Sequence, residues 1–180
     1  MEEKPAIIPV ELVPHRGEWA GMAASEHARL KAALGDNLVA THHVGSTAIP
    51  GIMAKPIVDL MPFVRDLDAL DAQENAVRGL GYKWHGEFGL EGRRFCSFVD
   101  PKTAKRTFQL HFFLPGNDHA TRMQAFRDYL RAHPFVAKEY EMEKIRAAAA
   151  QPHDTTAYNA EKNNWIKRVE KDAMAWTEKR

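Results

Sequence analysis

The chain has 180 residues and a formal net charge of +1 at pH 7, and this length predicts one domain, residues 1–180. Hydrophobic residues make up 44% and charged residues 27%, so the composition is that of a globular protein and not of a disordered one. The near-neutral charge excludes a nucleic-acid binder that works by general attraction, because such a protein needs a marked basic excess.

Cysteine content and hydropathy exclude other classes. Cys96 is the only cysteine, which rules out an internal disulfide and a thiolate metal cage. The sequence has no apolar run of about 20 residues that could cross a bilayer. Its start lacks the charged and apolar regions of a signal peptide. We therefore expect a cytoplasmic protein with no membrane association.

The first part of the chain alternates helix and strand patterns. Gly17 to Leu34 has apolar residues at three- and four-residue spacing, and Gly35 follows where a helix usually ends. This helix is expected to pack against a sheet that begins with an apolar strand, Leu38 to Val44. Further expected elements are a strand over Pro56 to Val64, a helix over Asp66 to Gly79, and short strands over 81–85, 93–99 and 106–114.

The second part of the chain has helix patterns only. Asp118 to Ala132 carries apolar residues on one face, and Pro134 suits the first turn of a helix that runs through Ala150. A last helix is expected to begin at Asp154 or Thr155, either of which can cap it. The order of elements predicts an α+β fold, a mixed β-sheet with a helical C-terminal half folded over it.

The stretch from His42 to Leu60 carries the main functional pattern. Gly45 and Ser46 end the first strand, where a glycine lets backbone N–H groups approach an oxyanion without a β-carbon in the way. Asp59 lies on the next strand, where a carboxylate could hold the metal ion that a triphosphate brings. The pattern predicts a phosphate-and-metal site; the structural alternatives are a plain tight turn and a buried acid paired with a neighbouring base.

The run from His43 to Asp59 resembles the signature of the GrpB family, approximately His-x-Gly-Ser-Thr-Ala-x-Pro-Gly-x-x-Ala-Lys-Pro-Ile-x-Asp. That family is similar to the polymerase-β-type nucleotidyltransferases, whose catalytic strand pair begins with Gly-Ser and continues to a metal-binding acid. The resemblance implies a nucleotidyltransferase-like mixed sheet with a site between the turn and the helical half. Other stretches that fit the family lie at residues 81–82, 92–95, 110–111, 126–131, 140, 144, 158 and 162.

One position departs from the pattern of the catalytic nucleotidyltransferases. They usually place a second acid two residues after the first, on the same side of the strand, and here that residue is Met61. Nucleotidyl transfer normally uses two divalent ions about 4 Å apart. One aspartate can hold one ion weakly, so other ligands must come from elsewhere; Glu87, Glu91 and Asp100 are possible sources.

His111 is the main candidate for the missing role. It lies on the predicted strand 106–114, which corresponds to the strand that brings a third acid in active nucleotidyltransferases. Family members often carry His-x-His here, whereas this chain has Gln109-Leu110-His111, which does not match a two-histidine metal site. His111 could bind the ion or accept the proton of an attacking hydroxyl, and the alternative is a hydrogen-bonded core histidine.

The resemblance also points to residues for the phosphates. Lys55 stands between the turn and Asp59, and Arg93 and Arg94 follow a glycine-rich hairpin; a phosphoryl group needs such cations. Some of the residues of the helical half that match family positions are expected to form the roof of the cleft, and Tyr158 could either stack a base or pack in the core. The resulting phosphate- and nucleotide-binding set is Gly45, Ser46, Lys55, Arg93, Arg127, Lys144, Tyr158 and Lys162.

The resemblance implies a metal-dependent nucleotidyltransferase that moves a nucleotidyl group from a nucleoside triphosphate to a hydroxyl of a small molecule or protein. Asp59 and His111 would be the catalytic and metal-binding residues, with Mg²⁺ or Mn²⁺ as the cation. One alternative is a non-catalytic nucleotide- or coenzyme A-related binding module that has lost the second acid, since the family also occurs joined to dephospho-coenzyme A kinase. Another is a metal-dependent phosphohydrolase. The expected partner is a nucleoside triphosphate or related phosphorylated small molecule, with no nucleic acid and no membrane.

Overall fold

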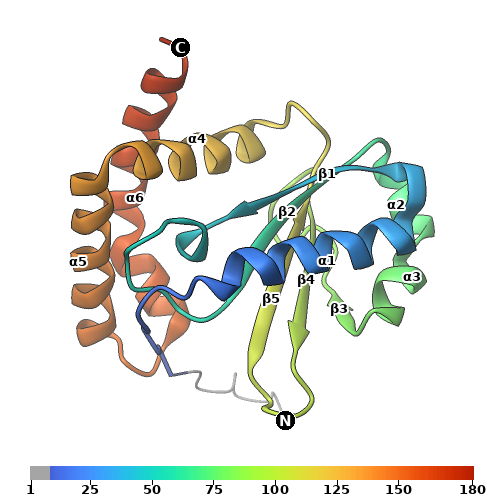
Figure 1. The fold of residues 1–180 in the computed structure, drawn as a ribbon, viewed down its shortest axis with the longest axis horizontal. Coiled ribbons are helices and arrows are strands. Elements are labelled where there is room, and N and C mark those ends of the chain that lie inside the picture. Colours follow the sequence, from blue (N-terminus) through green and yellow to red (C-terminus); the bar gives the residue numbers. More distant parts are fainter. Residues whose placement is uncertain (1–8) are drawn as a thin grey trace.

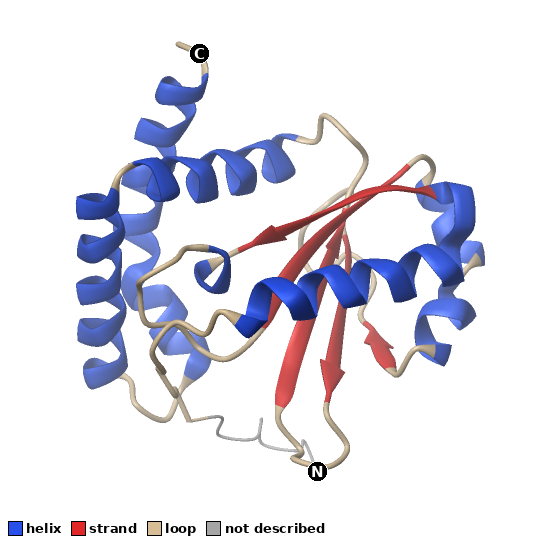
Figure 2. Cartoon of the chain, in the orientation of Figure 1, coloured by secondary structure: helices blue, strands red, loops and turns tan. Residues whose placement is uncertain are grey.

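A computed structural model describes residues 9–180 and contains a five-stranded mixed β-sheet flanked by helices (Figures 1 and 2). The strand order is β1-β2-β5-β4-β3; β2 and β5 are parallel and the other neighbouring pairs are antiparallel. The predicted α+β class is confirmed. The strands are β1 (Leu38–Val44), β2 (Val58–Val64), β3 (Tyr82–Trp84), β4 (Arg94–Val99) and β5 (Arg106–Phe112).

The helices occupy almost the segments that the sequence predicts. α4 and α5 begin and end at the predicted residues, because the Asn117 side chain caps the first and Pro134 opens the second. The helices are α1 (Glu18–Leu34), α2 (Leu67–Ala72), α3 (Glu74–Gly79), α4 (Asp118–Ala132), α5 (Pro134–Ala150) and α6 (Thr155–Thr177), with 3₁₀ turns η1 (Gly35–Asn37) and η2 (Ser46–Ala48). None of these helices combines the length and apolar character needed to span a bilayer.

The prediction of one helix over Asp66 to Gly79 is wrong, because the segment divides into α2 and α3 at Gln73. The Gln73 side chain donates to the carbonyl of Leu34 at 3.2 Å and accepts from the amide of Asn37 at 3.0 Å. These bonds tie the residue to the end of α1. The helix is therefore interrupted where Gln73 makes tertiary contacts, and the local sequence does not predict this interruption.

One face of the sheet is covered by α1, α2 and α3. Alternate side chains of β2 and β5, among them Leu60, Leu110 and Phe112, are buried against Trp19 and Leu30 of α1 in the larger apolar cluster. Figure 1 shows α1 lying across this face in front of the strands. Because side chains alternate along a strand, Asp59, Gln109 and His111 must point to the opposite face.

The opposite face is only partly covered by the C-terminal helices. α4 lies beside β1, and α5 and α6 pack against α4 and against each other at one end of the sheet (Figure 1). The loop between β1 and β2 inserts Ile49 and Ile52 among apolar side chains of these three helices, including Tyr140. This packing brings the Gly45-Ser46 turn next to α5 and leaves part of the sheet face open.

Candidate functional site

A cleft of about 610 Å³ opens between the uncovered sheet face, the β3–β4 hairpin and helices α5 and α6. Ser46, Asp59 and His111, which the sequence predicts to converge, all line it. Their placement is thus observed, while their chemical roles stay predictions. The other predicted site residues that line the cleft are Gly45, Lys55, Arg93, Lys144, Tyr158 and Lys162.

The carboxylate of Asp59 is held by two neighbours on β5. The Nε2 atom of His111 lies 3.2 Å from Oδ1 of Asp59. In the amide orientation that satisfies both of its groups, Gln109 donates to the same oxygen at 2.9 Å and accepts from Arg106 at 3.2 Å. Both neighbours contact Oδ1. The second oxygen, Oδ2, is therefore the one available to a ligand.

Gly45 lies against Oδ2 of Asp59. A β-carbon on residue 45 would be 2.8 Å from this oxygen, and Gly45 has φ +73°, in a region that L side chains rarely adopt. Only glycine therefore lets the turn approach the carboxylate this closely. Beside it, the Ser46 hydroxyl donates to the Tyr140 hydroxyl at 3.3 Å. The Gly-Ser pair is thus part of the cleft wall next to the acid.

Three lysines, Lys55, Lys144 and Lys162, form what we call the lysine cluster. Lys162 and Lys55 place their Nζ atoms 4.4 and 5.3 Å from the ring centroid of Tyr158. Lys144 is only 1% exposed, and its Nζ donates to the carbonyl of Met53 and lies 4.7 Å from the Tyr140 ring. Within residues 9–180, none of the three forms a salt bridge to a carboxylate. The cluster therefore concentrates basic side chains that no carboxylate pairs with.

Burial lowers the pKa of each lysine in the cluster, and repulsion from neighbouring cations lowers the pKa of Lys55 and Lys144 further. Burial is the largest cause for all three, and it brings the pKa of Lys144 to about 7 and those of Lys55 and Lys162 to about 8. The charge of Lys162 lowers the pKa of the other two further, whereas Asp59 raises the pKa of Lys55 and Lys162. An anion bound among them would favour their charged forms.

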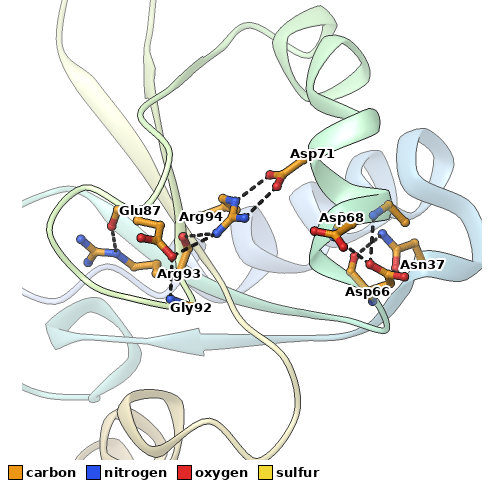
Figure 3. Close-up of polar contacts among 9 residues, drawn as sticks. Asn37, Asp66, Asp68, Asp71, Glu87, Gly92, Arg93 and Arg94 are labelled. Atoms are coloured by element: carbon orange, nitrogen blue, oxygen red, sulfur yellow. Dashed lines mark hydrogen bonds and ion pairs between the residues drawn. The ribbon is translucent and has the colours of Figure 1, made fainter.

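Arg93 and Arg94 point in different directions. Arg93 lines the cleft and donates to the backbone carbonyl of Glu87 at 3.2 Å (Figure 3). It also donates to the backbone carbonyl of Phe88 at 2.8 Å. Arg94, which the sequence analysis also placed beside the site, instead makes a double hydrogen bond to Asp71 of α2 at 2.6 and 2.7 Å (Figure 3). Arg94 begins β4 and Arg93 precedes it, and of the two only Arg93 lines the cleft.

Arg127 lies outside the cleft. Its guanidinium donates to Asp128 at 2.7 Å and to the backbone carbonyl of His43 at 3.1 Å. These bonds brace the end of β1 and do not fit the predicted phosphate-binding role. His43 itself bonds the Thr47 hydroxyl at 2.8 Å, and burial lowers its pKa to about 4. His43 therefore shapes the turn as a neutral ring.

The sequence matches a known protein family over most of its length. A family model described as "GrpB protein" matches residues 9–172. The chain belongs to the GrpB family.

Proteins similar to this chain agree with that assignment. The crystal structure of conserved protein GrpB from Enterococcus faecalis superposes with a TM-score of 0.86 at 33% identity, covering 93% of this chain and 99% of that one. The UPF0157 protein YqkA of Bacillus subtilis is 39% identical over 93% of this chain, which spans 48% of YqkA. A dephospho-CoA kinase of Mycolicibacterium paratuberculosis is 28% identical over 94% of this chain and 47% of its own length.

The cleft offers few side chains that could bind the predicted metal ion. The described residues hold no group of three or more histidine, cysteine, aspartate or glutamate side chains placed to bind a metal ion. Asp59 and His111 are two candidates, already in contact with each other. Glu87 does not line the cleft and instead accepts from the Gly92 N–H at 2.9 Å (Figure 3). A resident two-metal centre therefore does not fit the described residues.

Several cleft residues were missed by the sequence analysis. Gln109 could have been found, because it lies two residues before His111 and so on the same side of β5. Arg106 and Asn159 carried no motif, and Phe88 lies in the β3–β4 hairpin, where spacing predicts nothing. Their roles depend on how distant elements come together.

Proposed function

We propose that the cleft binds the phosphates of a nucleoside triphosphate and transfers its nucleotidyl group to a hydroxyl acceptor. The observation that carries this proposal is the lysine cluster opposite Asp59. Together with Arg93 and Arg106, the cluster gives the cleft five basic side chains, while Asp59 is the one carboxylate among the described residues that line it. A polyphosphate supplies the negative charge that such a site lacks.

Different residues of the cleft would have different roles in such a transfer. The acceptor oxygen would form a bond to the α-phosphorus while the bond to pyrophosphate breaks. The lysine cluster would neutralise the leaving pyrophosphate, since fixed cations at developing charge are the main catalytic resource in phosphoryl transfer. Oδ2 of Asp59 would take the hydroxyl proton, while His111 and Gln109 hold Oδ1 in place.

A divalent ion enters this proposal as part of the substrate. Triphosphates carry such an ion, which offsets phosphate charge. Phosphate oxygens would complete its coordination, because among residues 9–180 the cleft offers only Asp59 and His111 as candidate ligands. The N-terminus of α6 adds little to anion binding, since Asp154 already accepts from its Thr156 and Ala157 N–H groups at 2.9 and 3.0 Å.

A second candidate function is a binding module without catalysis. It is favoured by Met61, which stands where a second acid is expected and is completely buried. The similarity to a dephospho-CoA kinase makes a nucleotide- or coenzyme A-related ligand its most natural occupant. The same lysine cluster would then hold phosphates that are not transferred.

Calorimetric titration with ATP, CTP, GTP and UTP, each with and without Mg²⁺ or Mn²⁺, tests the proposal. We expect binding of at least one nucleotide, weakened about tenfold or more in Lys162→Gln because a charged hydrogen bond is lost. Lys171→Gln is the matched control, since this exposed lysine lies on the same helix and outside the cleft. Equal losses in both variants, or no binding of any nucleotide, would refute the phosphate site.

Pyrophosphate release separates the two candidates. With a panel of hydroxyl-bearing acceptors, the transferase should release pyrophosphate, and Asp59→Asn should abolish this release while nucleotide binding persists. If the wild-type protein binds a nucleotide but releases no pyrophosphate with any acceptor, the result favours the binding module.

A further inference from the structure

The rim of the cleft carries a stack of aromatic rings that the proposed phosphate chemistry does not use. Phe88 stacks on Phe95 with ring centroids 5.2 Å apart and planes 26° from parallel. Phe95 in turn lies 5.2 Å from the ring of His111, the partner of Asp59. His85 packs beside both phenylalanines, at 5.3 and 5.2 Å. The stack leads from the acid to the rim of the cleft.

The outermost ring of this stack faces solvent. Phe88 is 63% exposed, whereas Phe95 beneath it is 6% exposed. An exposed phenylalanine at the edge of a cleft leaves apolar area in water that a ligand could cover. Phe95 stacks against one face of the Phe88 ring. A planar group of a ligand would therefore stack on a ring that is already held from behind by packing.

The backbone holds Phe88 in this position. Its φ is +48°, which is uncommon for a bulky residue and persists only where the surroundings enforce it. The Arg93 guanidinium donates to the carbonyl of Phe88. It also donates to the carbonyl of Glu87, whose carboxylate accepts from the Gly92 N–H (Figure 3). These bonds connect the two sides of the hairpin loop and hold the backbone that carries Phe88.

We infer that Phe88 is the platform on which the base of the bound nucleotide stacks. The inference rests on the proposed phosphate site, and it deepens that proposal by naming the other end of the ligand. The cleft has a cationic interior and an aromatic rim, so it matches a molecule with an anionic end and a planar aromatic end. Stacking on an aromatic ring tolerates every base, because each has a π-face.

The test compares ATP with inorganic tripolyphosphate, which has the phosphates and no base. Phe88→Leu keeps an apolar side chain and removes the ring, and we expect it to weaken ATP binding about 5- to 150-fold. Tripolyphosphate should bind this variant within twofold of its affinity for the wild-type protein. Phe88→Tyr keeps the ring and should retain ATP affinity. Calorimetry gives both constants.

Phe135→Leu is the matched control, because Phe135 is 90% exposed on α5 and does not line the cleft. It should change neither constant. Unchanged ATP affinity in Phe88→Leu would overturn the inference, and equal losses for both ligands would show that Phe88 only supports the cleft. If tripolyphosphate fails to bind while ATP binding depends on Phe88, the phosphate proposal falls and the platform stands. If neither ligand binds the wild-type protein, both fall.

Discussion

Gly45 and Asp59 are packed so closely that residue 45 has no room for a side chain. A β-carbon there would lie 2.8 Å from Oδ2 of Asp59. This is the carboxylate oxygen left available by His111 and Gln109. The Gly-Ser turn therefore limits the position of the carboxylate oxygen that His111 and Gln109 do not contact.

Gly45→Ala should damage both stability and ligand binding. The backbone at φ +73° and ψ −173° is suited to glycine, so we expect a loss of about 1–3 kcal/mol in the free energy of unfolding. The added carbon must also displace the Asp59 carboxylate, which should end Asp59-dependent pyrophosphate release. Urea unfolding and the release assay measure the two effects. Gly51→Ala is the control, since Gly51 has φ +78° with no atom within 4 Å of the added carbon. It should lose stability only, and loss of release there would contradict the close-approach argument.

The alternation of side chains along a strand explains why residues of the site could be placed on one face of the sheet from the sequence. Asp59 and Gln109 are paired across β2 and β5, and His111 is two residues further along β5, so all three share a face. The residues that bound α4 and α5 act locally through caps and a first-turn proline. Local chemistry of this kind is visible in a sequence. The division of α2 from α3 was not, because the contacts of Gln73 come from α1 and its 3₁₀ extension.

The lysine cluster and the cleft wall at Ser46 depend on contacts between distant parts of the chain. Lys144 bonds the carbonyl of Met53, 91 residues away in sequence, and Ser46 bonds Tyr140, 94 residues away. The family pattern predicted that Lys144 belongs to the site but not that it is buried. Burial is the main cause of its low pKa. Arg127 matched the same pattern and lies elsewhere. A matched position alone therefore did not determine which side chains face the cleft.

Polyphosphate binding should weaken as the pH rises from 7 to 9. The cluster is fully charged only below the pKa values of its lysines, about 7 for Lys144 and about 8 for Lys55 and Lys162. A bound anion favours the charged forms, so binding in this range should take up protons. Calorimetry of tripolyphosphate in buffers of different ionisation enthalpy measures this uptake. Lys162→Gln should reduce it, and Lys171→Gln should leave it unchanged. Binding with no proton uptake at pH 8 would contradict the low lysine pKa values.

The unliganded protein should become more stable as the pH rises from about 7 to 8.5. Lys144 has a folded-state pKa of about 7, well below its ordinary value of 10.5, so in this range the unfolded chain binds more protons. Stability then rises with pH, because folding no longer has to bury the charge. Above this range Cys96 opposes the trend, since burial raises its pKa to about 12 and the unfolded thiol loses its proton first. Chemical unfolding at several pH values measures the slope, which Lys144→Met should reduce; parallel curves would contradict the assignment.

Met61→Asp should not restore a second metal-binding acid. Met61 is on the same face of β2 as Asp59, yet it is 0% exposed and packs with Val44, Phe113 and Ala120 beneath α4. A carboxylate there would be buried without a partner, so we expect a loss of several kcal/mol in the free energy of unfolding. Met61→Leu, which keeps the apolar contacts, should cost less than about 1.5 kcal/mol. Urea unfolding measures both. Wild-type stability in Met61→Asp, together with stronger Mg²⁺-dependent ATP binding, would instead mean that position 61 opens into the cleft.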